Sequence, residues 1–246
     1  MTTDPPVPGW LRELAARFAQ VPVPPVLRPP PGRGRRSAVL VLFGHGAPGS
    51  GGAPGPGGAA GAGDPDLLLI QRRPGLRRHG GQPAFPGGAI DPADAGPVDA
   101  ALREAAEEVG LDPAGVDVVG TAPELYIDRS EFRVVPVIGW WRRPVAVRAA
   151  DPDEVAAVAR VPIGEFADPA NRLIIRHPSG HSGPAFRVGG MLVWGFTAAL
   201  VSMLLTLGGW ETPWDTGRIE DLPPEALAAA SVKAQADGGN HDGHGW

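Results

Sequence analysis

Three glutamates with helical spacing, Glu104, Glu107 and Glu108, are the residues of this chain best suited to catalytic chemistry. At about 100° per residue, an α-helix places all three on one side. The opposite side then carries an apolar stripe formed by Leu102, Ala105, Ala106 and Val109. Like charges three and four residues apart repel one another, and only Arg103 is placed to offset one of them. A cluster of mutually repelling oxygen ligands suits a divalent cation, Mg²⁺ or Mn²⁺ above all.

A solvated helix face is the alternative interpretation of these acids. Such faces usually alternate positive and negative charges, whereas this helix has three acids against one base. The helix alone leaves both interpretations open, so the flanking residues matter. The Gly-rich segment Gly87-Gly88-Ala89-Ile90-Asp91-Pro92-Ala93-Asp94 precedes the helix, and Gly110-Leu111 follows the acids.

Together these residues resemble the Nudix box, which has a Gly, a distant Glu, Arg-Glu-x-x-Glu-Glu-x-Gly and an aliphatic residue. The matching residues are Gly88, Arg103-Glu104, Glu107-Glu108 and Gly110-Leu111. Asp94 stands where the box has its isolated Glu, and the span from Gly88 to Arg103 is one residue longer than the commonest form. The resemblance implies an α/β protein with the Nudix fold, a mixed β-sheet in a single-domain α/β/α sandwich.

The same resemblance implies roles for individual residues in a metal-dependent hydrolysis. The implied ligands of Mg²⁺ or Mn²⁺ are one glycine carbonyl group and three carboxylates: Gly88, Glu104, Glu107 and Glu108. Arg103 would orient Glu107 and its neighbour through charge-assisted hydrogen bonds. The number of ions stays open. The carboxylate that deprotonates the attacking water also stays open, and the candidates are Glu104, Glu131 and Glu154.

A second motif lies upstream of the helix and narrows the choice of substrate. Residues 68–88 resemble the signature of the coenzyme A (CoA) pyrophosphatase branch of the family, which runs from Leu-Leu-Thr-x-Arg to Phe-Pro-Gly-Gly. Ile70 replaces the Thr of that signature, and Arg73 replaces a small residue. Trp194-Gly195-Phe196-Thr197-Ala198 is similar to a Trp-Gly-x-Thr-Ala that this branch often shows near its last helix. The substrate-binding residues that the resemblance implies are Arg72, Arg77, Gly81, Phe85 and Gly87.

The chemistry of this upstream segment agrees with a phosphate-rich ligand. Four arginines, at positions 72, 73, 77 and 78, follow a short apolar run. CoA carries a pyrophosphate and a 3′-phosphate, and arginine is well shaped for bidentate contacts with phosphate. The alternative is a solvated basic loop that balances an acidic protein. A nucleic-acid partner is not expected, because the formal net charge is -5 and no aromatic residue lies between these arginines.

The predicted reaction is hydrolysis of the pyrophosphate bond of CoA or acyl-CoA to 3′,5′-ADP and 4′-phosphopantetheine or its acyl derivative. Three alternatives stay open. The first is a Nudix hydrolase of another diphosphate such as NADH, ADP-ribose or a dNTP. The second is a non-catalytic Nudix binding module, although such modules commonly lose the acids that are intact here. The third is an interaction protein that acts through residues 44–63.

Composition limits the remaining possibilities. A chain of 246 residues fits one domain with tails, expected here at 35–224 between an arm at 1–34 and a tail at 225–246. The absence of Cys excludes disulfides, thiolate metal sites and Cys nucleophiles. Residues 10–18 resemble an amphipathic helix rather than a signal peptide, so a cytoplasmic location is expected. The oligomeric state and the preference between free and acylated CoA stay open.

Several segments have predicted conformations. Strands are expected at 36–43, 66–70, 116–121, 126–127 and 132–141, and Pro136 would then need an edge or bulge position. Residues 44–63 are nearly all Gly, Ala, Pro and Ser, which predicts a disordered, inert insertion. The uncharged stretch 191–207 approaches membrane-spanning length, but its pattern predicts a strand followed by a helix, so no membrane partner is expected.

The histidines are not expected to bind a structural metal. His177 and His181 lie in a predicted loop, and neither has a carboxylate at helical spacing. His241 and His244 lie in the Gly-rich tail, where a solvated role is expected.

Overall fold

The computed structural model of the chain describes residues 6–46, 64–76 and 79–231. Its α-helices are α1 (Gly9–Ala19), α2 (Pro97–Val109), α3 (Ile163–Ala167), α4 (Gly195–Gly208) and α5 (Pro224–Ser231). The first eight strands are β1 (Arg35–His45), β2 (Pro65–Arg72), β3 (Pro83–Ala84), β4 (Gly87–Ala89), β5 (Val116–Thr121), β6 (Leu125–Ile127), β7 (Phe132–Trp141) and β8 (Val155–Pro162). The strands that follow are β9 (Arg172–Arg176), β10 (Ser182–Val188), β11 (Met191–Val193) and β12 (Ile219–Asp221).

The larger sheet is mixed and has eight strands. Its central order is β3-β2-β1-β7-β5, and β4, β6 and β8 pair with β1, β7 and β2 respectively. The β1–β7 pair is parallel, and the other pairs of this sheet are antiparallel. β1 pairs with β2 only near its carboxyl end, from Phe43 to His45, and with β4 near its amino end, from Ser37 to Val39. This divergence leaves room for β4 beside the start of β1.

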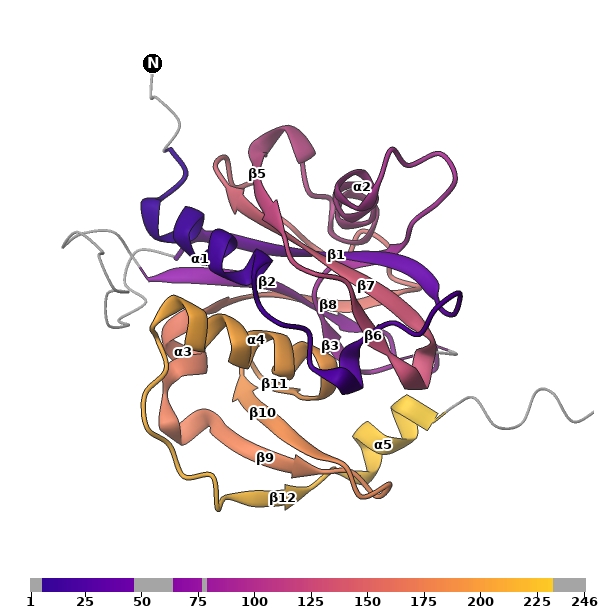
Figure 1. The fold of residues 1–246 in the computed structure, drawn as a ribbon, viewed down its shortest axis with the longest axis vertical. Coiled ribbons are helices and arrows are strands. Elements are labelled where there is room, and N and C mark those ends of the chain that lie inside the picture. The colour runs from indigo at the N-terminus through magenta and orange to yellow at the C-terminus, as the bar shows by residue number, and fades with distance from the viewer. Residues whose placement is uncertain (1–5, 47–63, 77–78, 232–246) are drawn as a thin grey trace, which may run out of the picture.

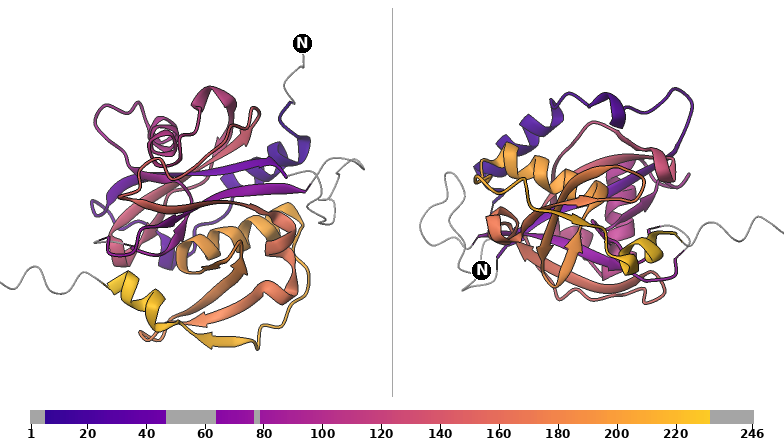
Figure 2. Two further views of the ribbon diagram at one scale, coloured as in Figure 1. Left: turned by 180° about the vertical axis from the view of Figure 1, so that it is seen from behind. Right: turned by 90° about the horizontal axis from the view of Figure 1, so that it is seen from below.

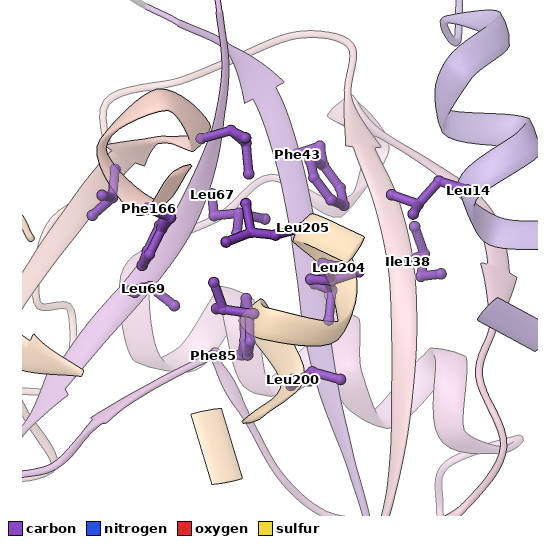
Figure 3. Packing of buried hydrophobic residues seen from close by; sticks show 14 of the residues in the cluster. Leu14, Phe43, Leu67, Leu69, Phe85, Ile138, Phe166, Leu200, Leu204 and Leu205 are labelled. Atoms are coloured by element: carbon purple, nitrogen blue, oxygen red, sulfur yellow. The ribbon is translucent and has the colours of Figure 1, made fainter. Parts of the chain in front are cut away.

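Helices cover both faces of the larger sheet, with α2 on one side and α1 and α4 on the other (Figures 1 and 2). Alternate residues of β1 explain the arrangement. Leu40 and Leu42 join the cluster under α2, whereas Val41 and Phe43 join the cluster under α1 and α4. Figure 3 shows Phe43 near Leu14 of α1 in the cluster under α1 and α4. The predicted mixed sheet in an α/β/α sandwich is therefore confirmed.

A second, four-stranded sheet lies beyond α4 (Figure 1), and of its strands the sequence predicted only β11, in the stretch 191–207. Its order is β11-β10-β9-β12. Phe186 and Val188 of β10 share a core cluster with α4, while Leu173 and Ile175 of β9 pack with Leu222 on the other face. Because apolar residues of β9 and β10 point to both faces, these short strands lack the clean alternation of apolar and polar residues that identifies a strand from sequence.

The predicted strands at 116–121 and 132–141 are observed with the same bounds. The predicted end of the first strand is wrong, because Gly44 and His45 continue β1 by pairing with Asp66 and Pro65. Of the expected insertion, residues 47–63 lie outside the described residues.

Pro136 lies inside the sheet, where β7 runs between β1 and β5. On one side its carbonyl accepts a hydrogen bond from Ala122, at 2.9 Å. Pairing with β5 ends at Val137, and pairing with β6 resumes at Val134. The proline nitrogen, which has no hydrogen to donate, thus falls in the gap between two partner strands rather than at an edge.

The uncharged stretch 191–207 forms β11 followed by α4, as its pattern predicts. Within the described ranges, no helix is long and apolar enough to cross a membrane. The stretch is core instead: Val201, Leu204 and Leu205 of α4 are fully buried.

Candidate active site

Helix α2 carries the predicted acids and has clear start and stop signals. Pro97 occupies the first turn, where its missing N–H costs nothing, and Asp99 follows it there. Gly110 ends the helix at φ 69°, a left-handed conformation that favours glycine. The buried residues of α2 are mostly small, with Ala101 and Ala105 facing β1 in the same core cluster. The helix can therefore lie close to the sheet.

Glu108 is buried against this sheet rather than solvated, because β4 and the end of β2 cover it. Its side chain is only 4% exposed. The backbone N–H of Gly87 donates to Oε2 at 2.9 Å, and Nη1 of Arg72 lies 3.3 Å from Oε1. Burial raises the pKa of Glu108 to about 7, although the Gly87 hydrogen bond and the charge of Arg72 oppose that rise. The expectation that only Arg103 offsets the helix acids is therefore wrong.

Glu104 packs directly on the backbone of β4. A Cβ atom on Gly88 would overlap the carboxyl group of Glu104, so glycine is needed at that position for this approach. Burial raises the pKa of Glu104, and the neighbouring charge of Arg103 opposes the rise. The structure thus brings together two of the predicted metal-ligand positions, Gly88 and Glu104.

Arg103 binds several acids at once. Its Nε and Nη2 lie 2.9 Å and 3.1 Å from the two carboxylate oxygens of Asp94. Nη2 also lies 3.0 Å from Glu104, and Nη1 lies 3.0 Å from Glu107. The carbonyl of Ala89 accepts a further hydrogen bond from Nη2, at 3.2 Å. These contacts lower the pKa of Asp94 and raise that of Arg103. Asp94, which replaces the isolated Glu of the Nudix box, thus pairs with Arg103, the arginine of the box.

The two base candidates outside the helix lie in different surroundings. Glu154 lies 3.5 Å from Nη2 of Arg72, and its charge contributes to the raised pKa values of Glu104 and Glu108. Glu131 instead pairs with Arg33 at 2.7 Å, at the start of β7. The structure therefore brings Glu154 close to the acids of α2.

The segment expected to bind substrate forms the end of β2, a turn, and β3 and β4. Gly81 adopts φ 69° and donates its N–H to the carbonyl of Arg72 at 3.1 Å. Gly87 lies so close to β1 that a Cβ atom there would overlap the carbonyl of Ala38. The Phe85 side chain is buried beside Leu200 of α4 (Figure 3), so it supports the turn from the core side. Arg77 lies outside the described residues.

The third segment with a family resemblance also reaches this turn. Oγ1 of Thr197, in the first turn of α4, donates a buried hydrogen bond to the carbonyl of Pro83 at 3.0 Å. Trp194 precedes α4, and its ring stacks on His177 with the ring centroids 6.3 Å apart. His177 and His181 both contact Ser179 in the turn between β9 and β10.

Comparisons with known proteins show the family of this chain. A family model described as NUDIX domain matches residues 58–178. A relative from Cronobacter sakazakii, an uncharacterized Nudix hydrolase named NudL, is 42% identical over 149 residues, which are 57% of this chain and 74% of the relative. The chain belongs to the Nudix hydrolase family. A NudL from Klebsiella pneumoniae is 43% identical over 148 residues, or 57% of this chain and 73% of that protein.

Solved structures of Nudix proteins are also similar to this Nudix hydrolase. RenU, a Nudix hydrolase from M. smegmatis, is 26% identical with a TM-score of 0.37, covering 55% of this chain and 74% of RenU. The NUDIX domain of Shewanella oneidensis NrtR, solved with ADP-ribose, is 20% identical with a TM-score of 0.39, covering 54% of this chain and 75% of that domain.

Nudix hydrolases generally use divalent metals such as Mg²⁺ or Mn²⁺. In the part of the chain that the structure describes, no three His, Cys, Asp or Glu side chains converge as ready-made ligands. Arg72 and Arg103 instead hold oxygens of the acids. The donor chemistry nevertheless fits such a cation. Burial raises the pKa of the Glu104 and Glu108 carboxyl groups, and the negative charge of Glu154 adds to both rises.

Proposed function

We propose that this Nudix hydrolase cleaves the pyrophosphate bond of CoA or acyl-CoA, giving 3′,5′-ADP and 4′-phosphopantetheine or its acyl derivative. The family supports hydrolysis of a nucleoside diphosphate derivative. The observation that carries the finer proposal is the buried hydrogen bond from Thr197 to Pro83. It joins the two segments that resemble the CoA branch, and it does so at the turn that leads to Gly87 and Glu108. The two segments that carry the resemblance are therefore in direct contact, close to the acids of α2.

Glu104, Glu107, Glu108 and the carbonyl of Gly88 would hold the cation in this proposal. When bound, Mg²⁺ or Mn²⁺ supplies neutralisation of the charge that develops on the pyrophosphate oxygens and lowers the pKa of the attacking water. The exposed Glu107 is held by Arg103 at 3.0 Å, and Glu104 by the same guanidinium at 3.0 Å. In this proposal Arg103 would orient Glu104 and Glu107 for the cation through these contacts.

The chain's own carboxylates then handle the proton. Water attacks one phosphorus, the bond from that phosphorus to the bridging oxygen breaks, and the other phosphate leaves with the bridging oxygen. Glu154 is a suitable acceptor for the proton of that water. Its side chain is half exposed, and it contacts Arg72, which also contacts Glu108. Glu104 is the second acceptor candidate, since burial raises its pKa and so its basicity.

A substrate panel tests the proposal. The full chain is incubated with CoA, acetyl-CoA, NADH, ADP-ribose and dNTPs in Mg²⁺ or Mn²⁺, and the products are identified by mass spectrometry. We expect kcat/KM to be highest for a CoA compound, with 3′,5′-ADP as a product, and a kcat at least about two orders of magnitude lower for a Glu108→Gln control. Higher kcat/KM for NADH, ADP-ribose or a dNTP would assign the chain to another Nudix activity. Binding without turnover of any substrate would make it a binding module.

The expected cytoplasmic location stays a prediction. A small-molecule substrate is the partner that this proposal requires, and neither nucleic acid nor a membrane takes part in it.

A further inference from the structure

Arg72 bridges two carboxylates that come from distant parts of the chain. It is the last residue of β2, and its side chain is 21% exposed. Nη1 lies 3.3 Å from Oε1 of Glu108 on α2, and Nη2 lies 3.5 Å from Oε2 of Glu154, just before β8. The guanidinium therefore lies between a buried acid of the Nudix helix and an acid outside it.

The segment that carries Glu154 is fastened to the chain beside Arg72. The backbone N–H of Arg73 donates to the Glu154 carbonyl at 2.7 Å. Nη1 of Arg73 lies 2.8 Å from Oδ1 of Asp153, and Val155 then pairs with Arg72 across β8 and β2. These contacts keep the Glu154 side chain within reach of the Arg72 guanidinium.

The charges around Arg72 show why this bridge matters. Arg103 is engaged by Asp94, Glu104 and Glu107. Among the residues that the structure describes, Arg72 is the cation in ion-pair contact with both Glu108 and Glu154. Without it, buried Glu108 would have no ion-pair partner among the described residues, and its burial would strengthen the repulsion from Glu104 and from the half-exposed Glu154.

We propose that Arg72 is a positioning residue, the internal counter-ion that holds Glu154 beside Glu108 and yields Glu108 when a divalent cation binds the acids of α2. The inference rests on the metal-dependent function proposed for this same site. It gives Arg72 a role toward the carboxylates, whereas the sequence resemblance implied contact with the substrate. It also selects Glu154, rather than Glu131, as the outside carboxylate that works with the helix.

Two consequences follow from competition between Arg72 and a cation for Glu108. Removing the guanidinium removes a competing positive charge, so cation binding becomes tighter. Removing it also leaves a buried carboxylate unpaired, so the chain without divalent cations becomes less stable.

The first experiment measures Mn²⁺ binding to the full chain by electron paramagnetic resonance of free Mn²⁺, with no substrate present. We expect Arg72→Met to bind Mn²⁺ at least about threefold more tightly than the unmodified chain. The matched control is Arg187→Met, which removes another arginine–glutamate pair, with Glu220 in the smaller sheet, and should leave Mn²⁺ affinity unchanged. Unchanged or weaker Mn²⁺ binding by Arg72→Met would overturn the proposal.

A double-mutant cycle without divalent cations tests the pairing itself. Arg72→Met should lower the free energy of unfolding less in a Glu108→Gln background than in the unmodified chain, because no buried charge is then left unpaired. Equal losses in the two backgrounds would contradict the pairing. If Arg72→Met does not fold, Arg72→Lys is used for both measurements. It keeps one positive charge without the two-pronged bridge, so it should still couple to Glu108 but bind Mn²⁺ more tightly than the unmodified chain.

Kinetics with CoA separate this role from substrate binding. We expect Arg72→Met to lower kcat by about tenfold or more while KM changes less than about threefold, because positioning acts on the reacting groups. A KM increase with unchanged kcat and unchanged Mn²⁺ binding would overturn the positioning role and indicate that Arg72 contacts the substrate. If CoA is not cleaved but the Mn²⁺ and double-mutant results hold, the proposed substrate fails and the role of Arg72 stands.

Discussion

Thr197 and Pro83, distant in sequence, meet in a buried hydrogen bond of 3.0 Å from the Thr197 hydroxyl to the Pro83 carbonyl. Thr197 belongs to α4 on one face of the larger sheet. Pro83 begins β3, which leads to β4, and the N–H of Gly87 in β4 binds Glu108 on the side of α2. This bond therefore connects the helix on one face of the sheet to the acids on the other.

Thr197→Val tests that connection by removing the hydroxyl while keeping the shape. We expect the free energy of unfolding to fall by about 1–3 kcal/mol, since the buried Pro83 carbonyl loses a donor. We also expect kcat to fall several-fold, because the turn that positions Glu108 loosens. Thr212→Val is the matched control, as it removes an exposed hydroxyl bond to the Ala167 carbonyl. Equal thermal stability for the two variants would contradict this reasoning.

Gly88→Ala should remove activity through Glu104. The added methyl group would overlap the Glu104 carboxyl group, which lies at the flexible end of its side chain and would move away. We therefore expect kcat to fall by about two orders of magnitude or more with a modest change in melting temperature. Gly96→Ala, where a Cβ atom meets open space, is the control for a Gly-to-Ala change near α2. Activity of Gly88→Ala close to that of this control would argue against a role for Glu104.

Glu108→Gln should lower kcat by at least about two orders of magnitude, because a carboxylate is lost from the proposed metal site. The amide oxygen can still accept the Gly87 hydrogen bond, so the fold should persist. Near-normal turnover of this variant in Mg²⁺ would contradict the assignment of the site.

The pH dependence of stability gives a second readout for Glu108. Burial raises its pKa from 4.5 to about 7 in the folded chain, so folding favours the protonated acid. Its contribution to stability is therefore fully present below about pH 4.5 and is lost as the pH rises through about 7. Glutamine does not titrate. We expect the melting temperature of Glu108→Gln to rise relative to the unmodified chain between pH 4.5 and 7.5, and a constant difference would contradict the raised pKa.

Replacing residues 47–63 with a short Gly-Ser turn should leave kcat/KM within a few-fold and the melting temperature unchanged or higher. Those residues are nearly all Gly, Ala and Pro, with neither the apolar side chains to join the core nor charges to join the site. They also follow the carboxyl end of β1, whereas β4 and the acids lie at its amino end. Gly44 and His45 are kept because they belong to β1. A large loss of activity would show that the insertion contacts the substrate.

Arg77→Ala should raise KM for CoA by about tenfold or more, and should raise KM less for ADP-ribose, which lacks the 3′-phosphate. Arg77 stands at the spacing of the CoA signature, and it remains a prediction because it lies outside the described residues. The comparison between substrates is the informative measurement, since Arg78 can partly substitute. Equal increases for both substrates would place Arg77 on the shared pyrophosphate, and no increase for either would make it a solvated residue.

The sequence by itself determined the features that depend on residues close to one another along the chain. The position and acidic pattern of α2 follow from a 3.6-residue period and from Pro97 and Gly110 at its ends. The strands at 116–121 and 132–141 follow from short apolar runs. The contact of Arg103 with Glu107, one turn along the helix, is local as well.

Only the tertiary structure decided which acids are buried and what neutralises them. Helical spacing places Glu108 with Glu104 and Glu107. The strands bury Glu108 most deeply, Glu104 packs on β4, and Glu107 stays exposed, while Arg72 reaches Glu108 from another strand. The position of Glu154 near these acids has the same origin, because pairing of β8 with β2 brings Glu154 to Arg72, whereas Glu131 pairs with Arg33. Such contacts depend on how strands far apart in sequence pair, and no local period or propensity encodes that pairing.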